Sequence, residues 1–97
     1  MEKAEALASA LVERRLAACV NIVGPIRSVY RWKDAIEREQ EYLLLIKTTA
    51  ERAADLAAAF SEVHPYELPE RVEVNIEGGS EAYLDWLSAQ TARDTNQ

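Results

Sequence analysis

Apolar and polar positions alternate along the chain in blocks, and the spacing within each block is typical of one secondary-structure element. Over residues 1–15, apolar side chains such as Leu7 and Leu11 recur three and four positions apart, with charged residues between them. This spacing places the apolar side chains on one face of a helix. The same spacing recurs over 50–63 and 80–90. We therefore predict three helices, over 1–15, 50–63 and 80–90.

Strand patterns fill the region between the first two helices. The apolar run 17–23 is too short for an independent helix and ends at Gly24-Pro25, so it is predicted as a buried strand with a kink after it. Beyond the kink, Tyr30 and Trp32 alternate with basic residues, which is typical of a ribbon with one aromatic and one basic face.

A second apolar run, 42–46, can pair back onto the first one if the chain reverses near Lys33-Asp34. The two runs together predict one long hairpin over 17–49. The sequence from Thr48 to Glu51 has the spacing of a capping box, in which the two side chains satisfy free amides where the next helix begins.

The last third of the chain continues the alternation of strand and helix. Val72, Val74 and Ile76 alternate with polar residues, which predicts a strand over 71–77. Ser80 then caps the last helix, and the polar tail 91–97 is expected to fray. Helices combined with an antiparallel sheet indicate a single α+β domain spanning residues 1–97, with the helices on one face of the sheet.

Composition narrows the functional classes. The 97 residues include 11 basic and 17 acidic side chains, for a net charge of −6. This charge repels nucleic acid and anionic membrane surfaces. No apolar run reaches the roughly 20 residues that span a bilayer, and no secretory leader is recognisable at the start. A single cysteine excludes an internal disulfide framework, so we expect a cytoplasmic protein.

The segment 64–70 concentrates the unusual chemistry. It holds the only histidine, His64, with Tyr66, Glu67 and two prolines. An imidazole can bind a metal or carry a proton at neutral pH. His64 is therefore either a metal ligand, with Glu67 or a second subunit completing the shell, or a cation that suits the end of a helix.

Other candidates also have two readings. Cys19 is either a small hydrophobe within a strand or a nucleophile, although no third group that would orient a Cys/His pair is identifiable. Tyr30 and Trp32 belong either to the core or to a subunit interface or cleft. Lys47 either snorkels at a strand end or faces an anion. The alternating carboxylates of Glu37, Glu39 and Glu41 are most simply a solvated edge.

Five motifs in order resemble the CutA divalent-cation tolerance family, and the match runs from about Ala4 to Leu87. The motifs are LAACVN at 16–21, SVYRW at 28–32, Glu41 with 44–49, HPYELPE at 64–70 and YLDWL at 83–87. The resemblance implies a ferredoxin-like subunit of βαββαβ type with an extra C-terminal helix. It also implies a homotrimer in which long hairpins pair between subunits, a link to copper and other divalent cations, and a likeness to the trimeric PII signalling proteins.

The sequence departs from this family at its start. Relatives normally begin with an apolar strand, whereas Met1 here already lies at the first helix, so the usual first strand is missing. In some relatives that strand carries a cysteine associated with copper binding, which has no counterpart here. Only His64 carries over from that site, and Val63 stands where some relatives have a second histidine.

Three functional hypotheses follow. The first is a non-enzymatic, cytoplasmic homotrimer that binds a divalent cation, with copper the leading candidate, or a small ligand in a cleft between subunits. Metal ligands would be His64 and Glu67, and the cleft would be lined by Cys19, Tyr30, Trp32, Lys47 and Tyr66. The second is a structural or PII-like signalling trimer whose partner is another protein or small molecule. The third is an enzyme with Cys19 as its nucleophile.

Overall fold

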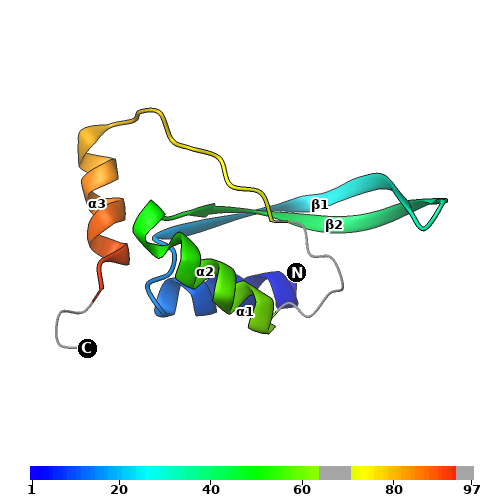
Figure 1. Cartoon of the computed structure of the whole chain (residues 1–97), viewed down its shortest axis with the longest axis horizontal. Coiled ribbons are helices and arrows are strands. Elements are labelled where there is room, and N and C mark those ends of the chain that lie inside the picture. The colour runs from blue at the N-terminus through cyan, green and yellow to red at the C-terminus, as the bar shows by residue number, and fades with distance from the viewer. Residues whose placement is uncertain (64–70, 94–97) are drawn as a thin grey trace.

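The computed structural model describes residues 1–63 and 71–93, and it has the α+β architecture that the sequence predicts. In chain order, the elements are α1 (Glu2–Glu13), β1 (Cys19–Trp32), β2 (Ala35–Lys47), α2 (Ala50–Val63) and α3 (Glu81–Thr91). Figure 1 shows a long hairpin with α1 and α2 on one side of its base and α3 beyond the base. The helix over 1–15 is thus confirmed, but it ends two residues early.

The hairpin reverses where the sequence predicts. Lys33 and Asp34 form a two-residue loop with φ values of 50° and 67°. Two consecutive residues of positive φ match the twist of the flanking strands, so the loop joins them without splaying them apart. The strands are antiparallel, and the register runs from Trp32 opposite Ala35 to Cys19 opposite Lys47.

The expectation that a strand ends at Gly24-Pro25 is wrong. The strand β1 continues through these residues, which oppose the single residue Tyr42 as an irregularity in the ladder between Val23 and Ile26. The extra residue is accommodated as a bulge, because proline cannot donate to the ladder and glycine tolerates the unusual backbone. Gly24 has a φ of 152°, in the region that favours glycine.

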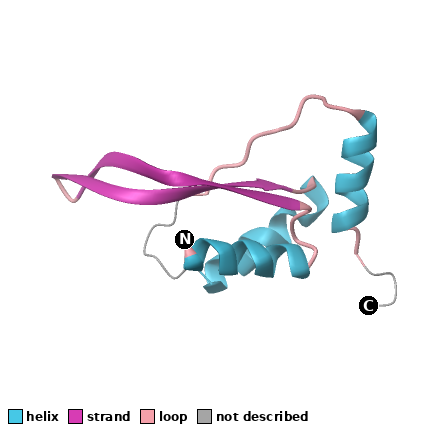
Figure 2. Cartoon of the chain, turned by 180° about the vertical axis from the view of Figure 1, so that it is seen from behind, coloured by secondary structure: helices cyan, strands magenta, loops and turns pink. Residues whose placement is uncertain are grey.

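A small core lies where the two N-terminal helices meet the hairpin base. Its buried members are Leu11, Leu16, Ala17, Leu56 and Ala59, and the half-buried Leu7, Val20 and Ile46 pack against them. The run 17–23 is therefore buried only at its start, because Asn21 and Val23 are exposed in the single chain. The outer half of the hairpin projects away from these helices (Figure 2).

The predicted capping box at Thr48 is replaced by a tertiary contact. The Thr48 hydroxyl donates to the backbone carbonyl of Leu16 at 2.6 Å, across the hairpin base. The amides of Leu16 and Ala17 both reach the Leu11 carbonyl, at 2.9 and 3.2 Å, as the chain leaves α1. The hydroxyl therefore satisfies a backbone acceptor in the turn into β1, rather than an amide at the start of α2.

The predicted strand over 71–77 does not form in the structure of the single chain. The segment is irregular, and Val72 and Val74 are 78% and 85% exposed. A strand needs a neighbour about 4.8 Å away to pair its backbone groups, and the described residues supply no such edge beside this segment. Residues 42–47 and 71–77 are not paired with each other, because β2 pairs only with β1 among the described residues.

The last helix begins as predicted and ends later. The Ser80 hydroxyl accepts from the Tyr83 amide at 3.1 Å, which confirms the N-cap. The predicted fraying from residue 91 is wrong for the first residues of the tail. Thr91 is buried and its hydroxyl donates to the Leu87 carbonyl at 3.0 Å, while Arg93 pairs with Asp55 at 2.7 Å. Residues 94–97 lie outside the described chain.

Candidate functional site

The two candidate residues at the hairpin base lie directly opposite each other. Cys19 opens β1, Lys47 closes β2, and their Cα atoms are ladder partners. The Ala18 amide donates to the Lys47 carbonyl at 2.8 Å, which fixes the two strand ends together. Both side chains are half-buried. A thiol and an ammonium therefore share one end of the hairpin, close to the core.

The aromatic candidates lie at the other end of the same hairpin. Tyr30 opposes Glu37, and Trp32 opposes Ala35 beside the turn. The Lys33 ammonium lies over the Trp32 ring, 5.7 Å from its centroid. Such a contact between a cation and a ring face is favourable, and it holds the indole at the tip of the hairpin.

The pKa of Tyr30 is raised above its ordinary value. Partial burial of the phenol is the largest cause, followed by its hydrogen bond to Glu39 and the negative charges of Glu39, Glu41 and Glu37. Each cause favours the neutral phenol over the phenolate. The Tyr30 phenol therefore stays neutral to a higher pH than an ordinary tyrosine does.

Within a single chain, the residues at the hairpin base, Cys19 and Lys47, lie far from the two aromatic residues near its tip. Eleven positions of one strand separate Cys19 from Tyr30, or roughly 35 Å at about 3.3 Å per residue. His64, Tyr66 and Glu67 lie outside the described residues. The candidate cleft residues that the structure describes therefore form two separate pairs.

The described carboxylates do not gather into a metal centre. Within residues 1–63 and 71–93, no group of three or more histidine, cysteine, aspartate or glutamate side chains is placed to hold an ion. On β2, Glu41 accepts a hydrogen bond from the Ser28 hydroxyl at 2.9 Å. Of the three glutamates expected as a solvated edge, Glu41 therefore bonds across the ribbon to β1, while Glu39 is exposed.

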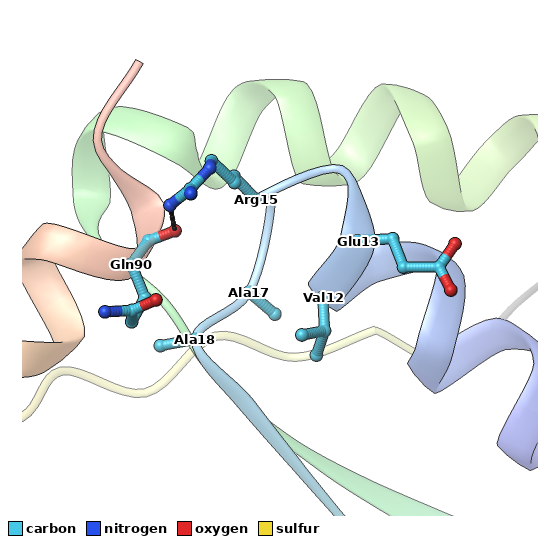
Figure 3. Close-up of a pocket in the computed structure, with 6 residues that line it drawn as sticks. All are labelled: Val12, Glu13, Arg15, Ala17, Ala18 and Gln90. Atoms are coloured by element: carbon cyan, nitrogen blue, oxygen red, sulfur yellow. Dashed lines mark hydrogen bonds between the residues drawn. The ribbon is translucent and has the colours of Figure 1, made fainter. Parts of the chain in front are cut away.

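One cavity near the hairpin base was missed by the sequence analysis. It measures about 140 Å³ and is lined by Val12, Glu13, Arg15, Ala17, Ala18 and Gln90. Figure 3 shows the Arg15 guanidinium reaching the Gln90 backbone, where it donates to the carbonyl at 3.2 Å, while the Glu13 carboxylate points away from this contact. The cavity is smaller than typical ligand pockets of about 300–1,000 Å³, so it suits water or a very small anion. No sequence signal connects two residues 75 positions apart.

Comparison with known proteins gives a consistent result. The family model described as "CutA1 divalent ion tolerance protein" matches residues 1–90. A divalent-cation tolerance protein CutA from Thermus thermophilus is 48% identical over 90 residues, which are 93% of this chain and 87% of that protein. Human Protein CutA is 42% identical over 88 residues, but this chain spans only 49% of its length.

Solved structures agree with the sequence matches. A divalent cation tolerance protein from Thermus thermophilus superposes with a TM-score of 0.90 at 47% identity, covering 94% of this chain and 88% of that one. CutA1 from Oryza sativa gives a TM-score of 0.92 at 37% identity, covering 97% and 86%. In the part of the chain that the structure describes, no helix is long and apolar enough to cross a membrane. Sequence and structure together show that the chain belongs to the CutA1 divalent ion tolerance protein family.

Proposed function

We propose that the protein acts in divalent-cation tolerance as a non-enzymatic homotrimer, and that it binds a cation or a small ligand between subunits. The observation that carries this proposal is the separation of the candidate residues within one chain. Along β1, Cys19 lies roughly 35 Å from Tyr30 and roughly 43 Å from Trp32, at about 3.3 Å per residue. A cleft that contains both pairs requires the tip of one hairpin to reach the base of another.

Exposed apolar surface supports the same assembly. Val72, Val74, Leu43, Leu45 and Trp86 are all more than two-fifths exposed, although the core of the described chain is small. Extended apolar surface of this kind is typical of subunit interfaces. Light scattering on a sizing column should report about three times the 10.9 kDa chain mass at micromolar concentration. A monomer under these conditions would contradict the assembly.

Metal binding is proposed at His64 with Glu67, and copper is the preferred ion by the usual affinity order of divalent metals. One imidazole without a thiolate forms a weak site, and protonation of the imidazole competes with the metal. Calorimetric titration with Cu²⁺ should therefore show weaker binding at pH 5 than at pH 7. His64→Ala should abolish the site, and Glu62→Gln serves as a control on an exposed residue outside it. If the Cu²⁺ affinity is the same at pH 5 and pH 7 and is unchanged by His64→Ala, His64 is not a ligand of the site.

The second candidate function is a structural or PII-like signalling trimer in which metal binding is incidental. It draws on the exposed apolar surface described above, which a partner protein can also cover. The Cu²⁺ titration distinguishes the two, because one site per chain that depends on His64 supports metal binding. Weak and heterogeneous binding supports the signalling role. For location we propose the cytoplasm, on the basis of the single half-buried cysteine.

A further inference from the structure

The helix α3 is attached to the rest of the chain by few buried side chains. Its buried residues are Leu87 and Thr91, and the segment 71–80 that leads to it is exposed throughout. Figures 1 and 2 both show α3 beyond the base of the hairpin. Polar contacts with the other elements therefore contribute a substantial share of what holds α3 in place.

The first of these polar contacts joins the end of α1 to the end of α3. The Arg15 guanidinium donates to the Gln90 carbonyl at 3.2 Å (Figure 3). Because α3 has no basic residue in its own last turn, Arg15 supplies the positive charge that a helix C-terminus favours. The guanidinium comes from another element, so it also fixes the end of α3 beside the turn into β1.

The backbone of Arg15 is held in a conformation that arginine rarely adopts. Its φ is 59°. The Arg15 amide donates to the Val12 carbonyl at 3.0 Å, and the amide that follows it donates to the Leu11 carbonyl at 2.9 Å. These two bonds form the Schellman ending of a helix, in which glycine is the usual residue at the position of Arg15. An arginine there costs free energy that a glycine would not, and the contact with α3 offsets part of that cost.

The second polar contact joins a residue just beyond α3 to the first turns of α2. The Arg93 guanidinium donates to Asp55 at 2.7 Å and lies 3.7 Å from the Glu51 carboxylate. The same Asp55 oxygen accepts from Arg52 at 2.8 Å. Since the Arg52 side chain is only 13% exposed and also donates to the carbonyls that follow α1, it ties α2 firmly to the end of α1.

Together the contacts form a closed cycle through the three helices. Arg93 joins α3 to α2, Arg52 joins α2 to the end of α1, and Arg15 joins the end of α1 back to α3. We define the arginine latch as these three residues and Asp55. All of its contacts join residues of one chain, so the latch does not require the assembly proposed above.

We propose that α3 opens from the core as a single unit and that the arginine latch holds it closed. An element with few buried side chains and exposed polar contacts opens at a lower free energy than the whole domain unfolds. Gln90 is the residue of α3 that lines the cavity at the hairpin base, beside the buried Ala17 and Ala18. Opening α3 therefore also exposes that cavity to solvent.

Amide hydrogen exchange tests whether α3 opens as one unit. Arg93→Gln removes the contact with Asp55, so the amides of residues 84–91 should exchange about twofold to fivefold faster, all by a common factor, because an exposed ion pair contributes modestly to stability. Amides of the β1–β2 ladder should keep their rates. Arg71→Gln is the matched control, since it breaks an ion pair with Glu73 that lies outside the latch, and it should leave exchange in α3 unchanged.

Two substitutions of Arg15 separate its side chain from its backbone. Arg15→Ala and Arg15→Gly both remove the contact with Gln90, so both should speed exchange in 84–91 by the same factor. The urea midpoint of unfolding should be higher for Arg15→Gly, because glycine suits the left-handed backbone. Arg14→Gln removes the same charge at the neighbouring exposed position and should leave exchange in α3 unchanged.

A measurement on the unmodified chain covers the case in which a variant fails to fold. The side chains of Asp55 and Arg93 are 41% and 55% exposed, so salt screens their attraction. Raising NaCl from about 0.1 M to about 1 M shortens the screening length from about 10 Å to about 3 Å. Exchange in α3 should then speed up relative to the β1–β2 ladder.

Four outcomes would overturn the latch. The first is exchange in α3 that neither Arg93→Gln nor Arg15→Ala changes. The second is acceleration confined to the last turn, 88–91, which is fraying rather than opening of the whole helix. The third is equal acceleration in the β1–β2 ladder, which means that α3 opens only when the whole domain unfolds. The fourth is a ratio of α3 to ladder exchange that does not depend on salt.

Discussion

At the scale of single residues, the backbone at the bulge of β1 depends on one side chain being absent. Gly24 has a φ of 152°, and a Cβ atom built there would lie 2.7 Å from Cδ1 of Tyr42 and 3.1 Å from the Glu41 carbonyl. The second contact is with backbone, which cannot easily move away. The position therefore requires glycine both for its conformation and for its close approach to β2.

Gly24→Ala should lower the free energy of unfolding by about 1–3 kcal/mol, because the added methyl group strains the bulge. Gly78→Ala is the matched control, since nothing lies within 4 Å of a Cβ atom there. Urea denaturation followed by circular dichroism measures both. Equal stability of the two variants would contradict this account of the bulge.

The raised pKa of Tyr30 predicts a dependence on alkaline pH. The folded chain holds the phenol proton to a higher pH than the unfolded chain, whose tyrosine has a pKa of 10.0. The stability that Tyr30 contributes is therefore fully present below about pH 10 and is lost as the pH rises through the folded value. Ultraviolet absorbance of the phenolate should show a high titration step that Tyr30→Phe removes.

Two variants sharpen the titration of Tyr30. Glu39→Gln should lower the pKa of Tyr30, because it removes a negative charge beside the phenol. Tyr83→Phe is the control, since it removes a phenol on α3 and should leave the high step in place. A high step that survives Tyr30→Phe would assign it to another residue.

At the scale of elements, the helices of this chain are stabilised by hydrogen bonds at their ends as well as by burial of their apolar faces. Arg52 on α2 donates to the carbonyls of Arg15 and Arg14, at 3.3 and 3.4 Å, just after α1 ends. These bonds satisfy acceptors that a helix end leaves free. At the start of α3 the same need is met locally, by the Ser80 hydroxyl and the Tyr83 amide.

Ser80→Ala should destabilise the protein by about 1 kcal/mol, which is the usual cost of losing an N-cap side chain. Ser88→Ala, at an exposed position inside the same helix, should be neutral or slightly stabilising, because alanine is the best helix former. Thermal unfolding of the two variants gives the comparison. If Ser80→Ala melts no lower than Ser88→Ala, the cap contributes nothing to stability.

At the scale of the whole molecule, the strands that the structure describes form a single two-stranded sheet. The segment 71–77 has the alternating pattern of a strand, and β2 has one edge that no described strand covers. An isolated hairpin is only marginally stable in water. Pairing by further strands would therefore contribute much of the stability of the assembled protein.

An apolar strand of about five to eight residues placed ahead of Met1 should pair with the backbone N–H and C=O groups at the uncovered edge of β2 and in segment 71–77. This pairing should raise the melting temperature by at least about 5 °C. A Gly/Ser extension of equal length is the control, because it has low strand propensity and no apolar side chains to bury. Amide exchange within 71–77 should slow only in the apolar variant. If both extensions melt alike, the sheet needs no added strand.

The sequence by itself determined the elements whose signals are local. Apolar spacing predicted α1, α2 and α3, and Lys33-Asp34 predicted the turn, because helix periodicity and turn conformation depend on neighbours within a few residues. Family motifs predicted the CutA1 membership that the comparisons then showed. For the candidate site, sequence selected the residue types at Cys19, Tyr30, Trp32 and Lys47, but it gave no distances between them.

Only the tertiary structure decided what depends on contacts between distant segments. The strand pattern of 71–77 stays unpaired because a strand exists only beside another strand, and alternation alone cannot supply that neighbour. The Thr48 hydroxyl does not cap α2 as expected, because it donates to the Leu16 carbonyl at 2.6 Å. The hairpin register places Cys19 and Tyr30 at opposite ends of β1. In each case the physical reason is the same, since pairing and burial are fixed by which surfaces meet in space rather than by the order of residues.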